Sequence, residues 1–152
     1  LFTLAAEEYG PPGTEANGRK VVGEWLEARA LKIADLTLDN GAGLSRDARM
    51  TARSLGGLLA YAYGSRFMPE YLSSLSLAGL DGTLSRRFRD PALQGMAHMK
   101  TGSLDHVSSI AGYLLGRSGD WYVAVLLLNH PDSHRGTGEE VQDALLRWLR
   151  EQ

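Results

Sequence analysis

Four consecutive residues, Lys100, Thr101, Gly102 and Ser103, form the most chemically suggestive group in the sequence. A fixed ammonium group can bind a carboxylate, and neighbouring hydroxyls can donate hydrogen bonds to the same anion. Glycine has no side chain, so a ligand can come close to the backbone at that position. These residues therefore predict one wall of a pocket for an acyl substrate that ends in a carboxylate. The competing interpretation is a solvated lysine before a turn, and the surrounding elements must decide between the two.

Histidine supplies the remaining candidates for acid–base or metal chemistry. His98 lies two residues before Lys100 and can share its strand face, where we expect a half-buried packing role rather than a general base. His130 and His134 flank a proline-containing segment that lacks the helical register of paired metal ligands, so we expect no metal there. His106 follows the lysine segment, and we expect its ring to face solvent. The sequence has no cysteine, which excludes disulfides and thiolate metal sites.

The composition is that of a globular protein. The chain has 152 residues, of which 43% are hydrophobic and 22% charged, so we expect one domain over residues 1–152. The net charge is -2, and the short basic cluster of Arg86, Arg87 and Arg89 cannot supply the field that a nucleic-acid partner requires. We interpret that cluster as a solvated turn. The longest apolar run, residues 121–128, is far shorter than the roughly 20 residues of a membrane-spanning helix, so no transmembrane segment is expected.

Helices are predicted where apolar residues recur at helical spacing behind a cap or before a breaker. Thr14 and Thr51 can each accept the capping hydrogen bond at the start of such a segment. The predicted helical segments are residues 1–9, a stretch that begins at Thr14, a stretch that begins at Thr51, residues 69–75 and residues 141–149. In the last segment, Leu145, Trp148 and Leu149 are available to cover one face of a sheet.

Beyond the turn-rich residues 78–91 the hydrophobic period changes from about 3.6 to 2, which predicts strands. The three predicted strands are residues 95–101, 107–116 and 121–129. Because the links between them are short, we expect an antiparallel meander. Helices before and after the strands then give an α+β fold, with an antiparallel sheet flanked by helices.

Four segments together resemble a known family. They are Asp-Asn-Gly-Ala-Gly-Leu-Ser-Arg at 39–46, Ala-Gly-Leu-Asp-Gly-Thr-Leu at 78–84, Lys-Thr-Gly-Ser-Leu at 100–104 and Ile-Ala-Gly-Tyr at 110–113. In this order and spacing they are similar to the C-terminal part of a penicillin-binding protein of the D-alanyl-D-alanine carboxypeptidase and endopeptidase family. Ala42 replaces the usual serine, and Ser103 stands where threonine is common. The resemblance implies an incomplete β-lactamase/transpeptidase-like fold that carries three of the sheet strands.

The resemblance also implies a function: serine-type cleavage of peptidoglycan stem peptides, inhibited by β-lactams, without a cofactor or metal, in the periplasm or cell envelope. Lys100 would hold the terminal carboxylate of the substrate, and Thr101 and Ser103 would add hydroxyl donors. The backbone amide of Ser103 would be one oxyanion donor, and Gly102 would let the peptide pass close to the backbone. Since strand residues alternate sides, we expect Lys100 to project away from Thr101 and Ser103, toward a Ser-x-Asn element. The Asp81-Gly82-Thr83 turn would lie near the cleft.

The sequence departs from the family in what it lacks. Such enzymes need a nucleophilic serine three residues before a lysine, and a Ser-x-Asn motif. The residues three positions before Lys20, Lys32 and Lys100 are Asn17, Arg29 and Ala97, and no Ser-x-Asn occurs. We therefore expect this chain to be the downstream half of a catalytic domain, inactive by itself.

Two other functions remain open at this point: a non-catalytic module that binds peptidoglycan peptides or a partner protein, and a relative of the serine β-lactamases or esterases. The resemblance further implies that two more strands complete the sheet, one of them beside residues 121–129. Without that neighbour, an apolar edge would be exposed, and we expect self-association through it.

Overall fold

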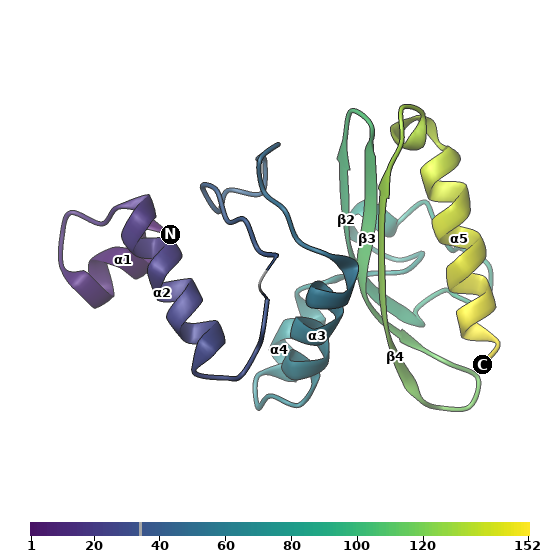
Figure 1. The fold of residues 1–152 in the computed structure, drawn as a ribbon. Helices are drawn as coiled ribbons and strands as arrows, with labels where there is room; N and C mark the ends of the chain where they lie inside the picture. The colour runs from purple at the N-terminus through teal and green to yellow at the C-terminus, as the bar shows by residue number, and fades with distance from the viewer. Residues whose placement is uncertain (34) are drawn as a thin grey trace. The chain divides into compact units, whose positions relative to one another are not determined.

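The computed structural model describes residues 1–33 and 35–152. The chain is organised as two compact units, Leu1–Gly57 and Leu58–Gln152, which we describe separately. Figure 1 shows the order of the elements along the chain. The second unit contains the sheet and the lysine segment.

The first unit begins with a pair of packed helices, α1 (Phe2–Tyr9) and α2 (Glu15–Glu27). The Thr14 hydroxyl accepts a hydrogen bond from the backbone amide of Asn17, so the predicted cap of α2 is confirmed. Downstream, Thr37 and Arg49 form an isolated antiparallel bridge around the loop that contains residues 39–46. The α2 helix and the segment after it also line a mainly apolar hollow of about 720 Å³.

Helix α3 (Ala52–Tyr63) begins at a capping arrangement that the sequence predicts only in part. The Thr51 hydroxyl accepts from the amide of Ser54, as expected. In addition, the Asp35 carboxylate accepts hydrogen bonds from the Thr51 amide (2.5 Å) and the Ser54 hydroxyl (2.6 Å). Hydrogen bonds from the Ser54 side chain and the Thr51 backbone to the charged form lower the pKa of Asp35 to about 2.

This capping predicts acid-sensitive stability of the first unit. Because the folded-state pKa of Asp35 lies below its ordinary value, its contribution is complete above about pH 4 and is lost as the pH falls toward 2. We expect Asp35→Asn to lower the thermal midpoint near pH 6 and to converge with the wild type near pH 2. Asp47→Asn, at an exposed acid in the same unit, serves as the control in the same pH series. A constant difference across the range would contradict the assignment.

The second unit is built on a four-stranded sheet in the order β1-β2-β3-β4, with every neighbouring pair antiparallel. The strands are β1 (Ser76–Leu77), β2 (Ala97–Leu104), β3 (Val107–Leu115) and β4 (Trp121–Asn129). The predicted α+β fold class is thereby confirmed. The third predicted strand matches β4 residue for residue, whereas β2 runs three residues beyond its predicted end and β1 was not predicted.

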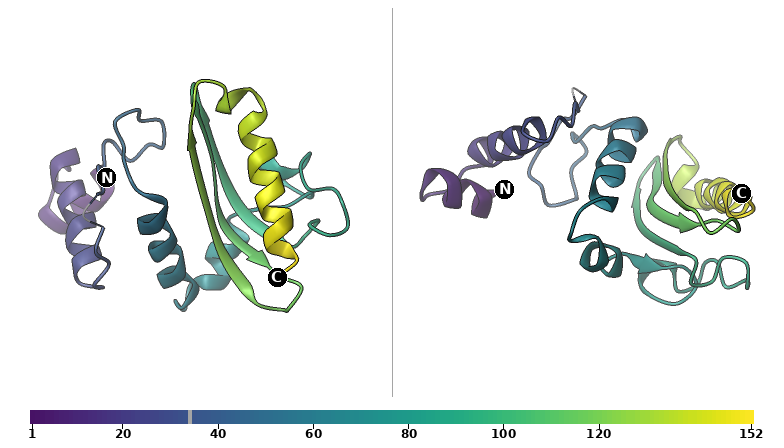
Figure 2. Two further views of the ribbon diagram at one scale, coloured as in Figure 1. Left: turned by 45° about the vertical axis from the view of Figure 1, so that its right-hand side comes forward. Right: turned by 90° about the horizontal axis from the view of Figure 1, so that it is seen from below.

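Helices lie on both faces of this sheet, as Figure 2 shows. Helix α5 (Thr137–Arg150) covers one face, and α4 (Met68–Ser73) lies toward the other. Residues between β1 and β2, including the 3-10 turn η1 (Gly82–Leu84), complete the core on the α5 side, and a second turn, η2 (Ser133–Arg135), precedes α5. The main buried side chains of this core are Leu84, Phe88, Leu93, Met99, Ile110, Leu114 and Leu146.

Two sequence interpretations were wrong in this unit. Leu145 and Trp148 do not cover the sheet, since they are 42% and 60% exposed. The buried face of α5 instead carries Gly138, Gln142 and Leu146. The face was misassigned because a polar residue, Gln142, occupies a core position and donates to the Ser108 hydroxyl at 2.9 Å.

Arg87 is the second correction, because its side chain is only 13% exposed and is not part of a solvated turn. Its guanidinium donates to the Asp143 carboxylate and to Gln142 Oε1 (3.2 Å), and it lies 3.8 Å from Glu139. Arg86 and Arg89 are exposed, as expected.

Candidate functional site

The lysine segment occupies the second half of β2. Lys100 pairs with Ala111 of β3, and its side chain is exposed, with Nζ donating to the carbonyl of Thr101 at 2.5 Å. Successive strand residues alternate faces, so Lys100 shares its face with His98, while Thr101 and Ser103 lie on the face of Met99. An ammonium group and two hydroxyls therefore project from opposite faces of one short stretch of strand.

A hydroxyl from a distant segment joins this stretch. The Thr101 hydroxyl is hydrogen-bonded to the Thr83 hydroxyl, with 2.8 Å between the two oxygens. Thr83 lies in η1, eighteen residues upstream, and its contact with Thr101 was not predicted from the sequence. The only available signal was the resemblance of residues 78–84 to a segment near the cleft.

The turn that carries Thr83 has a fixed shape. The Asp81 carboxylate accepts from the Leu77 amide at 2.6 Å, which confirms the turn that was predicted there. Gly82 has φ +51°, and a Cβ at this position would lie 2.2 Å from the Ser76 hydroxyl oxygen. The left-handed backbone conformation therefore favours glycine in this turn, and the turn holds Thr83 beside β2.

Gly102 and Ser103 are both exposed and pair with Ser109 and Ser108 of β3. A Cβ at Gly102 would meet only the Ser109 hydroxyl, at 2.6 Å, and that side chain can rotate. The fold could therefore accommodate a small side chain at position 102. Free access to the backbone of β2 is the physical property that Gly102 supplies.

At position 112, by contrast, the packing of the strands leaves no room for a side chain. It pairs with Met99, and a Cβ there would lie 2.1 Å from the carbonyl oxygen of His98. Strands β2 and β3 approach closely at the residue directly before Lys100. This close approach fixes the position of the lysine segment relative to the rest of the sheet.

Aromatic rings pack on the face of the sheet that carries Lys100. His98 is half-buried, as predicted, with Nδ1 3.2 Å from the carbonyl of Leu72 and its ring 6.0 Å from that of Trp121. On β3, the Tyr113 hydroxyl donates to the carbonyl of Leu59 at 2.7 Å. Burial, with a smaller contribution from Tyr71, raises the pKa of Tyr113 to about 12. A phenol with so high a pKa stays neutral and acts in packing and hydrogen bonding.

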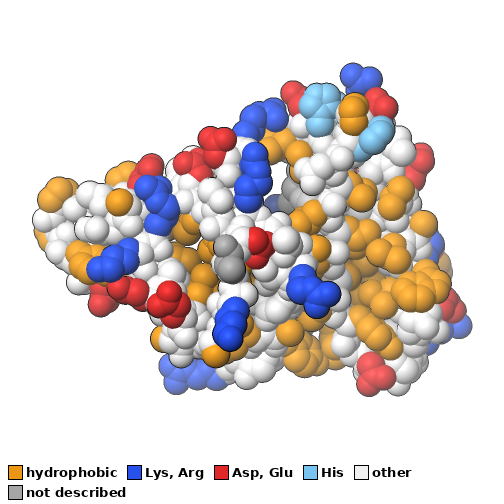
Figure 3. Space-filling model, viewed as in Figure 1, with side chains coloured by type: hydrophobic (Ala, Val, Ile, Leu, Met, Phe, Trp, Pro, Cys, Tyr) orange, Lys and Arg blue, Asp and Glu red, His pale blue; other side chains and the backbone are white. Residues whose placement is uncertain are grey.

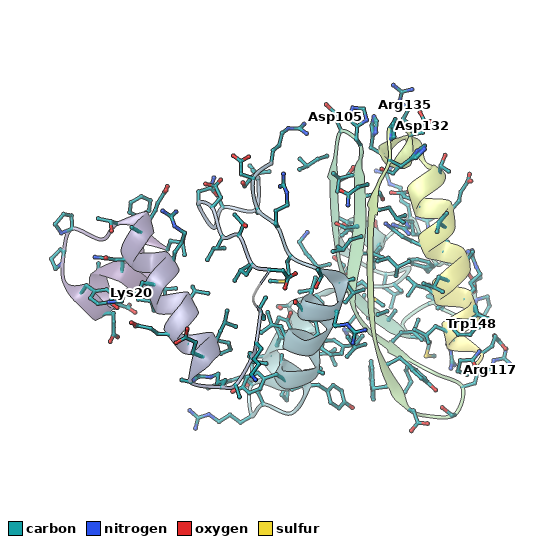
Figure 4. All side chains as sticks on the ribbon, in the orientation of Figure 1. Lys20, Asp105, Arg117, Asp132, Arg135 and Trp148 are labelled. Atoms are coloured by element: carbon teal, nitrogen blue, oxygen red, sulfur yellow. The ribbon has the colours of Figure 1, made fainter. Side chains whose placement is uncertain are left out.

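The remaining histidines meet at the turn between β2 and β3. The backbone amide of His106 donates to Nδ1 of His134 at 3.0 Å, and the two rings stand edge to face, 5.4 Å apart. Figure 4 shows Asp105, Asp132 and Arg135 at the same end of the sheet. His106 is exposed, as expected. Within residues 1–33 and 35–152, no three or more His, Cys, Asp or Glu side chains converge as a metal site would require.

The sequence model of the D-Ala-D-Ala carboxypeptidase 3 (S13) family matches residues 1–152. The chain belongs to this family. Among the helices of the described residues, none combines the length and the hydrophobicity needed to cross a membrane.

Relatives in the S13 family agree with this assignment. The chain is 33% identical over 157 residues to a D-alanyl-D-alanine carboxypeptidase of Actinomadura sp. (strain R39), covering 99% of this chain and 28% of that protein. It is 40% identical over 116 residues to penicillin-sensitive carboxypeptidase A of Dictyostelium discoideum, covering 75% of this chain and 21% of the relative. The chain thus spans less than a third of the length of either relative.

Solved structures show the same fold. Penicillin binding protein 4 from Haemophilus influenzae, in complex with a β-lactam, superposes with a TM-score of 0.90 over 99% of this chain and 37% of that one, at 23% identity. A penicillin G-acylated predatory endopeptidase from Bdellovibrio bacteriovorus gives a TM-score of 0.60 over 87% of this chain and 38% of that one, at 17% identity. These likenesses confirm the penicillin-binding transpeptidase-like fold.

Three of the four segments that suggested the S13 family meet in the second unit. Residues 100–104 form the exposed end of β2, residues 110–113 pair with β2 along β3, and residues 78–84 bring Thr83 to the Thr101 hydroxyl. The fourth segment, residues 39–46, lies in the first unit.

Proposed function

We propose that this chain is the part of a serine-type D-Ala-D-Ala carboxypeptidase or endopeptidase that binds the terminal carboxylate of a peptidoglycan stem peptide. The observation that carries the proposal is the exposed end of β2, where Lys100, Thr101 and Ser103 follow one another and the Thr83 hydroxyl lies alongside. The names of the relatives support the reaction class. The site belongs in the periplasm or cell envelope, where the peptide substrate occurs.

In the proposed reaction a serine from outside this chain attacks the carbonyl carbon between the two terminal D-alanines. The carbon–nitrogen bond breaks, the last D-alanine leaves with a proton on its nitrogen, and an acyl-enzyme ester remains. Water then hydrolyses the ester and regenerates the serine. This chain contributes no nucleophile, because no serine stands three residues before any of its lysines.

The proposed role of the β2 residues is to stabilise negative charge on the substrate. Lys100 would act from the opposite face of β2, through the positive charge that it adds to the field around the substrate carboxylate and the developing oxyanion. Thr101 and Ser103 would donate hydroxyl hydrogens to the carboxylate, and the Ser103 amide would donate to the oxyanion. Gly102, which has no side chain, would let the peptide come close to the backbone of β2. Opposite faces of β2 thus divide these roles between the ammonium and the hydroxyls.

The test uses the full-length enzyme and a fluorescent penicillin, because a relative of known structure is acylated by penicillin G. We expect Lys100→Ala to slow acylation roughly 10- to 100-fold, since a charge-assisted hydrogen bond contributes about 1.5–3 kcal/mol. Lys100→Arg, which keeps the charge, should recover part of the rate. Lys32→Ala, at an exposed lysine of the first unit, is the matched control.

Three results would contradict this proposal. Unchanged acylation in Lys100→Ala would remove Lys100 from the site. A full-length protein that binds a D-Ala-D-Ala peptide but is never acylated would be a non-catalytic binding module. Rapid release of the penicillin would instead place it among the β-lactamases.

A further inference from the structure

The hydroxyl of Thr83 lies beside the lysine segment without belonging to it. Its oxygen is 2.8 Å from the hydroxyl oxygen of Thr101, although the two residues are eighteen positions apart in the sequence. Thr83 is exposed and Thr101 is half-buried, so the pair lies at the surface. Hydrophobic side chains gather over β4 (Figure 3), whereas this pair of hydroxyls lies beside β2, two strands away in the sheet.

The register of the sheet brings Thr83 to the face of β2 that carries Thr101. Ser76 of β1 pairs with Met99, and paired residues project from the same face of a sheet. Thr101, two residues beyond Met99, shares that face. A Cβ at Gly82 would lie 2.2 Å from the Ser76 hydroxyl oxygen, so the backbone of η1 lies directly against the Ser76 side chain. The next residue of η1 is Thr83, which therefore meets Thr101.

Contacts on both sides of Thr83 fix the position of its backbone. Before it, the Asp81 carboxylate accepts a hydrogen bond from the Leu77 amide of β1 at 2.6 Å. After it, the Leu84 side chain is fully buried in the core, and the Leu84 carbonyl accepts from the Gly79 amide at 3.1 Å. An exposed hydroxyl is thus carried by a short segment whose two ends are anchored in the sheet and in the core.

The Thr101 side chain, by contrast, has more than one possible orientation. Rotation about χ1 moves a threonine between staggered positions and exchanges the places of its hydroxyl and methyl groups. The hydrogen bond to Thr83 favours the one orientation in which the Thr101 hydroxyl points toward η1. Ordering a hydrogen-bonding group before a ligand arrives lowers the entropic cost of binding that ligand.

We propose that Thr83 is a positioning residue for the carboxylate site, and that it holds the Thr101 hydroxyl in the orientation that receives an anion. This inference rests on the proposed function, in which Thr101 donates to the terminal carboxylate of a stem peptide or a β-lactam. Thr83 acts through Thr101 and does not itself have to contact the substrate. Its effect is therefore confined to ligands that carry the carboxylate.

The test compares Thr83→Val, which keeps the shape of the side chain without its hydroxyl, with Thr83→Ser, which keeps the hydroxyl. In the full-length enzyme we expect Thr83→Val to slow acylation by a fluorescent penicillin roughly 2- to 10-fold, the range of one neutral hydrogen bond. Thr83→Ser should recover most of the rate. Thr137→Val makes the same change at an exposed threonine of the second unit and should have no effect.

The methyl ester of the same penicillin separates positioning from folding, because the ester has no carboxylate for Thr101 to bind. We expect the difference in acylation rate between the wild type and Thr83→Val to disappear with the ester. The thermal midpoints of the two proteins should agree within about 2 °C, because a substitution at an exposed position changes stability little. Equal slowing with the penicillin and with its ester would make the contact a structural one and overturn the inference.

A double substitution distinguishes this inference from the proposed function. If Thr101→Val leaves acylation unchanged, the proposed function fails at this residue, since Thr101 then has no part in holding the carboxylate. If Thr101→Val slows acylation but Thr83→Val does not, only the inference about Thr83 fails. We expect both single variants to slow acylation, and the double variant to be no slower than Thr101→Val, because Thr83 acts only through Thr101.

Discussion

Replacing Gly112 with alanine should unfold the second unit or destabilise it by about 4 kcal/mol or more, which is exceptional for one added methyl group. The new Cβ would lie 2.1 Å from the His98 carbonyl oxygen and 2.9 Å from the Met99 Cα. Both are backbone atoms of β2, so neither can move without breaking the β2–β3 ladder. The backbone at position 112 also has φ +155°, a conformation that glycine adopts with less strain than alanine.

Gly102→Ala is the matched control for this prediction, because it adds the same methyl group to the neighbouring strand of the same sheet. Its Cβ would meet only the Ser109 hydroxyl, which can rotate away, so we expect a loss of less than about 1 kcal/mol. Denaturant unfolding followed by circular dichroism compares the two variants. If both variants lost a similar amount of unfolding free energy, the close approach of β2 to β3 would not be the reason why position 112 needs glycine.

Arg87→Ala should lower the free energy of unfolding by about 2–3 kcal/mol, which corresponds to a midpoint lower by roughly 5–10 °C. The substitution leaves the half-buried Asp143 carboxylate and the Gln142 amide oxygen without their guanidinium donor. It also removes the cation over the Phe88 ring, whose centroid lies 4.9 Å away. Together these groups connect the β1–β2 segment to α5.

Arg86→Ala removes the same charge from an exposed position one residue away, and we expect a change within about 0.5 kcal/mol. Both variants can be compared by calorimetry at one pH and ionic strength. If the two lost stability equally, the effect would come from net charge rather than from the contact with Asp143.

Local signals account for the parts of the fold that were predicted well. Thr14 and Thr51 cap their helices as expected, because a capping hydrogen bond involves residues only three positions apart. The bounds of β4 were predicted correctly because a continuous apolar run ends at turn residues on both sides. The β1 strand has only two residues and no pattern, and it exists because distant β2 pairs with it.

Long-range contacts explain the errors. Charge predicts a surface position for Arg87, but Asp143, fifty-six residues later, pairs with it in the interior. Hydrophobicity placed Leu145 and Trp148 in the core, whereas Gln142 is the buried residue because Ser108 accepts its amide hydrogen. The lysine segment was found because it is contiguous. The family resemblance implied that the turn with Thr83 lies near the cleft, but the hydrogen bond between Thr83 and Thr101 was not predicted, because only folding brings the two residues together.

The contact between Thr83 and Thr101 has a consequence for how an anion would be received. Each hydroxyl has one hydrogen and can both donate and accept. If Thr101 turns its hydrogen toward a carboxylate, its oxygen becomes free to accept from Thr83. The pair would then act as a relay, in which the arriving charge reverses the direction of an existing hydrogen bond and polarises the donor that faces it.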